Sequence, residues 1–138
     1  MKPAMKSAQV KKITPLLYAE DLEPSIKFWR ERLGFQKVAE IPEGGKIGFV
    51  ILDKDGTELM YQSYASVEKD NAATAAVVRK GPTCLYVEVE DLDATMAATD
   101  GAEVFMTPRT TFYHAREFGI KEPAGHYIIF AQHDVDDE

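Results

Sequence analysis

The sequence is poor in several features that small proteins use for stability or chemistry. Of its 138 residues, Cys84 is the single cysteine and three are histidines. An intrachain disulfide and a cysteine-based zinc motif are therefore excluded. No apolar run is long enough to span a bilayer, and the lysine-containing N-terminal segment lacks the continuous apolar stretch of a secretory signal. We expect a soluble chain located in the cytoplasm.

Basic residues are also few, which limits the partners of the chain. Lys and Arg number 16 against 23 Asp and Glu, so the formal net charge is −7. A phosphate-binding loop is missing too, because Gly44-Gly45-Lys46 continues with Ile47 where such a loop needs Ser or Thr. We expect neither a nucleic-acid nor a membrane partner. The acidic balance favours neutral or cationic small ligands.

What the sequence does contain is enough apolar material for one folded domain, together with an internal repeat. Hydrophobic residues make up 45% and charged residues 28% of the chain, as in ordinary globular domains. Asp21 and Asp91 each follow an apolar run and precede a helical pattern, and Gly56 and Gly125 each follow in a turn. The separation in sequence between Asp21 and Gly56 differs by a single position from that between Asp91 and Gly125. The two halves therefore share one layout.

The first half predicts one helix and four strands. Asp21 can cap a helix in which Ile26, Trp29 and Leu33 recur at helical spacing, and Gly34 predicts its end. Glycine and proline turns separate the apolar runs that follow. The predicted strands of this half are residues 13–18, 35–39, 47–52 and 59–64.

The second half repeats this order, with a predicted helix over residues 92–99. An alanine-rich segment, 67–79, lies between the halves and is either a connecting helix or a loosely ordered linker. One helix for several strands excludes a doubly wound parallel sheet. We predict an α+β fold: two tandem βαβββ modules whose curved mixed or antiparallel sheets surround a cleft, with helices outside. The predicted strands of the second half are residues 84–89, 102–106, 112–120 and 127–131.

The predicted organisation is one domain between two tails. The domain covers residues 13–132 and consists of a first module at about 13–65, a linker helix at about 66–81 and a second module at about 82–132. Residues 1–12 are expected to form a flexible tail, and 133–138 an acidic one.

Two stretches resemble a known superfamily. Residues 13–22, followed by Phe28-Trp29-Arg30-Glu31-Arg32-Leu33-Gly34-Phe35, are similar to the opening of vicinal-oxygen-chelate proteins such as glyoxalase I, extradiol dioxygenases and bleomycin-resistance proteins. Ala115-Arg116-Glu117-Phe118-Gly119, before a turn with Pro123, is similar to the bleomycin-resistance branch in particular. The resemblance covers roughly residues 12–132. It implies paired modules around a cleft and a homodimer with two ligand crevices between its subunits.

The resemblance also indicates which positions would hold the ligands of a metal ion. Metal-using members hold a divalent ion with histidine and carboxylate side chains on the first and last strands of each module. The matching positions here are Thr14, Met60, Cys84 and Ile129, which are poor donors for such an ion. We expect no metal, no cofactor and no catalytic residue. The competing hypothesis is a metal-dependent lyase, isomerase or oxidoreductase of the glyoxalase or dioxygenase type. Its atypical ligands would be Glu58, His114 and Glu117.

Side-chain alternation along the strands predicts which residues face the cleft. Glu58 or Glu88 is expected to attract a positive group. His114 falls where the bleomycin-resistance proteins carry an aromatic residue that stacks on the drug, and it can still stack or donate a hydrogen bond. His126 and His133 are interpreted as surface or turn residues. The predicted ligand-binding residues are Thr14, Leu16, Tyr18, Phe49, Glu58, Met60, Cys84, Tyr86, Glu88, His114, Phe118, Tyr127 and Ile129.

The leading functional prediction is a non-catalytic, homodimeric protein that sequesters a hydrophobic or aromatic drug or metabolite. A positive charge on that ligand would suit the acidic chain. This is the kind of role that the bleomycin-resistance resemblance implies in antibiotic resistance. A third hypothesis, beside the metal enzyme, is a domain that binds a protein partner and no small ligand.

Overall fold

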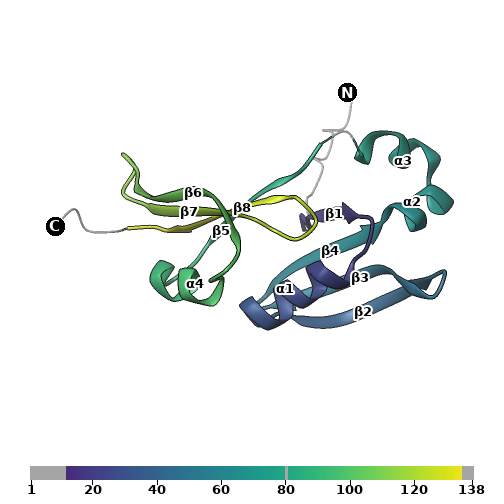
Figure 1. The fold of residues 1–138 in the computed structure, drawn as a ribbon, viewed down its shortest axis with the longest axis horizontal. Coiled ribbons are helices and arrows are strands. Elements are labelled where there is room, and N and C mark those ends of the chain that lie inside the picture. Colours follow the sequence, from purple (N-terminus) through teal and green to yellow (C-terminus); the bar gives the residue numbers. More distant parts are fainter. Residues whose placement is uncertain (1–11, 80, 135–138) are drawn as a thin grey trace, which may run out of the picture.

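The computed structural model describes residues 12–79 and 81–134 and contains two four-stranded sheets (Figure 1). Sheet A has the strand order β1-β4-β3-β2 and sheet B has the order β5-β8-β7-β6. The first strand of each module is parallel to the last, and the other pairs are antiparallel. This arrangement confirms the predicted α+β fold of two βαβββ modules. The expected tails, 1–12 and 133–138, lie outside the described residues except for Lys12, His133 and Asp134.

The first module places one long helix against sheet A. Helix α1 (Glu23–Leu33) ends where Gly34 adopts φ 74° and donates its N–H to the Arg30 carbonyl, as predicted. The helix starts slightly later than the expected cap at Asp21, whose carboxylate accepts the Glu23 N–H at 3.1 Å. The strands of this module are β1 (Leu16–Ala19), β2 (Gln36–Glu43), β3 (Lys46–Lys54) and β4 (Thr57–Ser63).

The second module repeats the order with a shorter helix, α4 (Leu92–Ala98), which Asp91 caps by accepting the Ala94 N–H at 3.0 Å. The strand predicted over residues 112–120 is wrong at its beginning. Residues 112–114 form the turn between β6 and β7, closed by hydrogen bonds between Thr111 and Ala115. His114 has φ 63° there, which a regular strand does not allow. The strands are β5 (Cys84–Glu88), β6 (Glu103–Thr110), β7 (Arg116–Lys121) and β8 (Tyr127–Gln132).

The segment between the modules is helical. Helices α2 (Tyr64–Asp70) and α3 (Ala72–Val78) meet at Asn71, whose side chain accepts the Thr74 N–H and so caps α3. Ser63 caps α2 in the same way through the Ser66 N–H. The alanine-rich stretch therefore forms two short helices. Within residues 12–79 and 81–134, no helix is long and apolar enough to cross a membrane.

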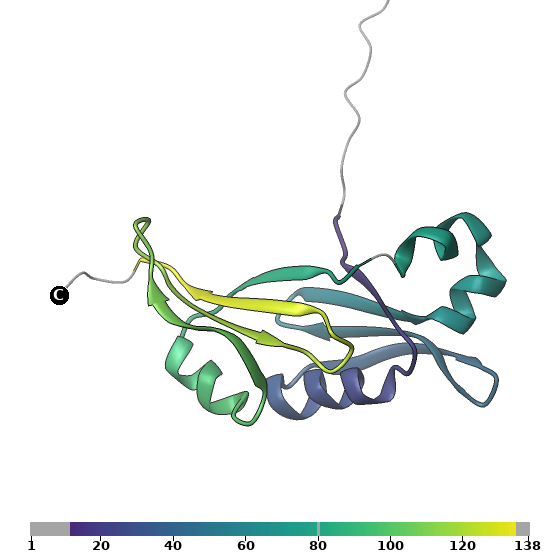
Figure 2. The same ribbon diagram turned by 45° about the horizontal axis from the view of Figure 1, so that its top comes forward.

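The hydrophobic core lies between the sheets and the helices α1 and α4, which lie on the same side of the molecule in both views (Figure 2). Strand β3 shows the alternation that produces it: Val50 and Leu52 are fully buried, whereas Phe49 and Ile51 point to the opposite face and are half-buried. We call this second side of each sheet its open face. The large core side chains include Leu17, Leu22, Trp29, Tyr61, Leu92, Ile120, Ile128 and Phe130.

A buried carboxylate connects the two modules through this core. Glu122, in the turn after β7, accepts hydrogen bonds from the hydroxyl groups of Tyr61 at 2.7 Å and Ser25 at 3.1 Å. The Trp29 indole N–H donates in turn to the Tyr61 oxygen at 2.8 Å. Module 1 thus supplies the side-chain donors and module 2 the acceptor. All of these polar groups are satisfied although they are buried.

His126 makes a second connection, and the expectation that it lies at the surface is wrong. The residue does lie in the turn before β8, but its side chain is buried. Its Nδ1 accepts the Thr83 N–H at 2.9 Å, so its Nε2 carries the proton and donates to the Tyr18 carbonyl at 2.8 Å. The imidazole is buried because it satisfies backbone groups beside β5 and in β1 together.

Candidate functional site

The open face of sheet A carries apolar side chains beside helix α2. Leu16 is the register partner of Met60, and Phe49 is the partner of Gln62. The Gln62 side chain donates to the Ser66 hydroxyl at 3.0 Å, which links the sheet to α2. An open pocket of about 510 Å³ lies here. Its lining residues are Leu16, Ile41, Glu43, Phe49, Gln62, Ser66, Lys69 and Asp70.

Tyr18 and Glu58 lie on the same face of sheet A and differ in their electrostatic surroundings. Burial, and then the nearby charge of Asp70, raise the pKa of the Tyr18 phenol, which therefore stays protonated. The Glu58 carboxylate forms an ion pair with Lys12 at 2.9 Å. The charge that Glu58 could offer a cationic ligand is thus already paired.

A second pocket, of about 310 Å³, brings predicted site residues from both modules together. Glu58 from β4 and both Tyr86 and Glu88 from β5 border it, along with Trp29 and Phe35. The walls are mainly apolar because the remaining lining residues are Pro15, Thr57, Leu59, Leu85 and Val87. The pocket therefore lies where the edge of sheet B approaches the start of β4.

The open face of sheet B is aromatic. Phe105 lies directly on Gly119, where an added Cβ would be 2.5 Å from the Phe105 ring. The ring reaches this place because the register of β6 against β7 shifts between Val104 and Met106. Phe105 also contacts Tyr127 edge to face, with the ring centroids 4.8 Å apart. Tyr127 and Phe105 thus form an aromatic pair on this face, and Tyr86 lies on the same face opposite Ile129.

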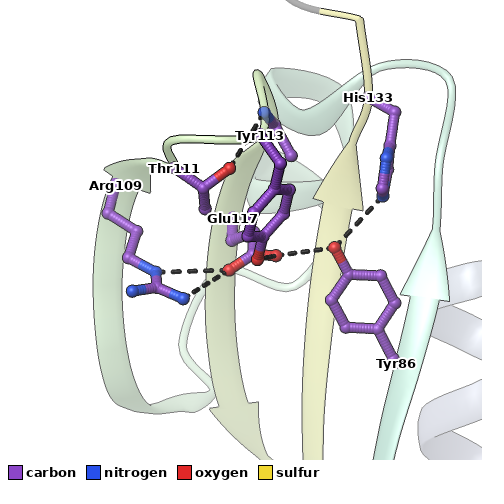
Figure 3. A network of polar contacts seen from close by, with 7 residues as sticks. Tyr86, Arg109, Thr111, Tyr113, Glu117 and His133 are labelled. Carbon is purple, nitrogen blue, oxygen red and sulfur yellow. Dashed lines mark hydrogen bonds and ion pairs between the residues drawn. The ribbon is translucent and has the colours of Figure 1, made fainter.

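At the hairpin end of sheet B, three polar side chains bond Glu117 (Figure 3). Its Oε1 accepts two hydrogen bonds from Arg109, from Nε at 3.2 Å and from Nη2 at 2.8 Å. Its Oε2 accepts the hydroxyl groups of Tyr86 at 2.6 Å and Tyr113 at 2.5 Å. The Tyr86 oxygen also lies 3.1 Å from Nε2 of His133. Both carboxylate oxygens of Glu117 are therefore satisfied.

These contacts fix the protonation states of the cluster. Burial raises the pKa of Glu117. The hydrogen bonds from Tyr113, Tyr86 and Arg109 together lower it by more than burial raises it, so that the pKa lies below its ordinary value. Burial and the hydrogen bond to Glu117 raise the pKa of Tyr86, and the same carboxylate raises that of Arg109. At neutral pH Glu117 is therefore a carboxylate, Arg109 a guanidinium and Tyr86 a neutral phenol.

Most of the predicted ligand-binding residues lie on the open faces or their edges. Phe118 does not: it is 6% exposed and stacks on Phe130 in the core, because the neighbouring Glu117 takes the outward position in β7. His114 lies exposed in the hairpin turn and not in a strand. The predicted residues on the open faces are Leu16, Tyr18, Phe49, Glu58, Met60, Cys84, Tyr86, Glu88, Tyr127 and Ile129, with Thr14 just before β1.

Sequence reasoning missed several members of this site. Phe105 lies inside the strand predicted over residues 102–106, but its place over Gly119 depends on a register shift that alternation does not indicate. Arg109 was missed because the predicted strand stopped at Met106, whereas β6 continues to Thr110. Tyr113 was placed in a strand, and His133 in a tail. An antiparallel hairpin centred on residues 111–115 would have paired Arg109 with Glu117, as the register does.

The described residues do not fit a metal ion. No group of three or more histidine, cysteine or acidic side chains among the described residues could hold one. Glu58, His114 and Glu117, the atypical ligands considered from the sequence, therefore do not come together as a site. Glu117 is moreover saturated by its own donors. Ile129, at a position that resembles that of a metal ligand, offers only hydrocarbon.

Comparisons with known proteins agree with this architecture. The model of the glyoxalase/bleomycin resistance protein/dioxygenase superfamily matches residues 9–130. A glyoxalase/bleomycin resistance protein/dioxygenase from Nocardioides is 20% identical, with a TM-score of 0.71 over 96% of this chain and 89% of the other. Lactoylglutathione lyase from Agrobacterium tumefaciens is 17% identical, with a TM-score of 0.70 over 90% and 95%. No curated protein matches in sequence.

A further solved structure, the bleomycin resistance determinant encoded on the transposon Tn5, is 16% identical, with a TM-score of 0.65 over 91% of this chain and all (100%) of the other. At these identities the likeness concerns the fold. It covers nearly the whole length of each protein, so both modules are shared.

Proposed function

Because the chain belongs to the glyoxalase/bleomycin resistance protein/dioxygenase superfamily, we propose that it is a non-catalytic protein that binds and sequesters a small planar molecule. The observation that carries this proposal is the aromatic open face of sheet B, on a chain whose described residues offer no fitting metal site. The planar compound would be a hydrophobic or aromatic drug or metabolite, as in the bleomycin-resistance branch.

The binding energy would come from burial and stacking. Phe105 and Tyr86 are each about half exposed, so a ligand that covers them removes apolar surface from water. Such burial contributes about 25 cal/mol per Å², and an aromatic contact of good geometry adds about 0.5–1.5 kcal/mol. Cys84 and Ile129 supply small apolar surface beside these rings. Sequestration requires only this affinity and no bond rearrangement.

The proposal includes a homodimer. One chain leaves apolar side chains exposed on both open faces, for example Ile41 on sheet A and Phe105 on sheet B. Exposed apolar surface of this kind is typical of an interaction site or a ligand groove. Two chains that bring sheet A of one against sheet B of the other would cover both faces and form two crevices. Sedimentation velocity of the purified chain would measure this; a species with the mass of one chain at micromolar concentration would contradict it.

The central experiment combines metal analysis with ligand-dependent stability. The chain is dialysed against a chelator, its metal content is measured, and melting is recorded with nickel, manganese, zinc or iron and then with planar aromatic compounds. We expect no stoichiometric metal, no stabilisation by the ions, and a raised Tm with some aromatic compounds, since a ligand at about 100 times its Kd adds roughly 2.7 kcal/mol. One tightly held equivalent of metal would favour the enzymatic alternative. Insensitivity to every compound would favour a protein partner.

A further inference from the structure

The open face of sheet B contains a surface built around a buried charge. Glu117 is 1% exposed, yet the three side chains that bond it remain accessible: Arg109 at 56%, Tyr86 at 50% and Tyr113 at 42%. We call these three side chains the Glu117 platform. A ligand on this face contacts the platform and not the carboxylate beneath it (Figure 3). Glu117 is thus a positioning residue, and the platform sets the polarity that a ligand meets.

Glu117 is unavailable as a counter-ion for a cationic ligand. Its Oε1 is occupied by two N–H groups of Arg109 and its Oε2 by two phenolic hydroxyl groups. A cation would have to displace at least one of these donors. Tyr86 and Tyr113 each use their single O–H in these bonds, so they offer a ligand mainly their ring faces.

Arg109 is different, because three of its five N–H groups do not bond Glu117. A guanidinium has five N–H groups in a fixed plane, and only that of Nε and one of Nη2 bond Glu117. The Tyr113 hydroxyl group also interacts with the guanidinium and helps to raise its pKa. The edge formed by Nη1 and Nη2 points away from the occupied side, and such an edge matches the two oxygens of a carboxylate.

The neighbouring charges do not cancel this preference. Glu88 is the acidic group beside the platform, and its carboxylate lies 4.0 Å from Nε2 of His133, with the side chain directed to solvent at 67% exposure. Lys121 lies on the same face of β7 and pairs loosely with Glu103 at 3.9 Å. The donors that are both fixed in position and free to bind therefore belong to Arg109.

From this geometry we infer that the ligand of sheet B is a planar aromatic compound carrying a carboxylate or a similar oxyanion. Its ring lies against Tyr86 and Tyr113, whose hydroxyl ends converge on one oxygen of Glu117, and its oxyanion bonds the outer edge of Arg109. The inference rests on the proposed binding function and names its ligand class. It replaces the cationic ligand that the acidic composition favoured.

Three probes with the same ring and different charges distinguish the contribution of the charge to binding from that of the ring. The full chain is titrated with 2-naphthoate, 2-naphthamide and 2-naphthylmethylammonium, and affinities are measured by calorimetry and by NMR shifts. We expect 2-naphthoate to bind about tenfold more tightly than either of the others, and its advantage to shrink as salt rises. Equal or tighter binding of the ammonium probe would overturn the inference while leaving the binding function intact. Failure of all three probes, together with failure in the wider compound screen, would count against the proposed function itself.

The variants locate the effect. Arg109→Gln should weaken the binding of 2-naphthoate about tenfold and leave the affinity for 2-naphthamide nearly unchanged. Arg109→Lys, which keeps the charge but not the planar fork, should recover only part of the loss. The matched control is Arg116→Gln, which removes an arginine from the helix side of sheet B, where it pairs with Asp93. Equal losses in Arg109→Gln and Arg116→Gln would contradict the assignment, and Arg109→Lys preserves the test if the glutamine variant folds poorly.

Discussion

The two buried glutamates at opposite ends of strand β7, Glu117 inside the strand and Glu122 just after it, are satisfied in different ways. Glu122 receives hydrogen bonds from neutral groups only, the hydroxyls of Ser25 and Tyr61 and the backbone N–H of His126, deep in the core between the modules. Glu117 accepts hydrogen bonds from a guanidinium and two phenols on the open face. The first carboxylate joins parts of the fold that are distant in sequence. The second holds exposed side chains in position.

Stability and ligand binding therefore depend on different glutamates of the fold. Removing Glu122 leaves buried donors without an acceptor, whereas removing Glu117 releases half-exposed donors that water can satisfy. We therefore expect Glu122 to determine the free energy of unfolding, and Glu117 to determine the arrangement of the side chains that a ligand contacts.

Glu122→Ala should cost about 3 kcal/mol of unfolding free energy, because the hydroxyls of Ser25 and Tyr61 and one backbone N–H lose their acceptor in a dry core. Urea unfolding followed by the fluorescence of Trp29, which bonds Tyr61, measures it. Glu103→Ala, at an exposed position, is the control and should change the free energy by less than about 0.5 kcal/mol. A loss no larger than that of the control would show that the core does not depend on this carboxylate.

His126→Leu should cost about 2 kcal/mol, since the Thr83 N–H and the Tyr18 carbonyl would lose their partners where the modules meet. The loss should be accompanied by faster amide hydrogen exchange at Thr83 and in β1 than in β3. His133→Leu is the matched control, because that imidazole is more exposed and lies on the open face. Uniform acceleration over all strands would indicate global destabilisation in place of a loosened junction.

The acid dependence of stability should distinguish Glu117 from other carboxylates. Because its folded pKa is lower than its unfolded pKa, Glu117 adds stability that is fully present above the unfolded value. That stability is lost as the pH falls below about 4.3 and through the folded pKa. Glu117→Gln should therefore show a flatter decline between pH 5 and pH 3 than the unchanged chain. Parallel declines in the two proteins would mean that the platform does not hold the charged form.

The sequence predicted the scaffold better than the site, for a physical reason. Alternation and the turn glycines depend on local chemistry, so the shared face of Leu16, Met60, Tyr86 and Ile129 on their strands could be predicted. Phe118 was predicted to bind ligand but packs in the core, because Glu117 takes the open-face position in β7. The hydrogen bonds of Glu117 also join residues distant in sequence, which periodicity does not indicate.

The smallest expected effect concerns Gly119 and Phe105, and it separates the shape of the open face from the stability of the fold. An alanine at position 119 would put its Cβ 2.5 Å from the Phe105 ring, which must then move, and the half-exposed ring can do so at small cost. Gly119→Ala should therefore cost less than about 1 kcal/mol of unfolding free energy while breaking the contact with Tyr127 and weakening binding of planar probes.

The double variant Gly119→Ala with Phe105→Ala makes this argument quantitative. If steric contact with Phe105 is the only difficulty, the alanine at 119 should cost nothing more once the ring is gone, and the coupling energy should equal the whole single-variant loss. If the alanine costs as much in the absence of the ring, the glycine is required by the β6–β7 backbone pairing itself. The nearest other neighbour is Met106, whose Cβ would lie 3.1 Å from the added methyl group, so a cost that persists without the ring would be assigned to that contact.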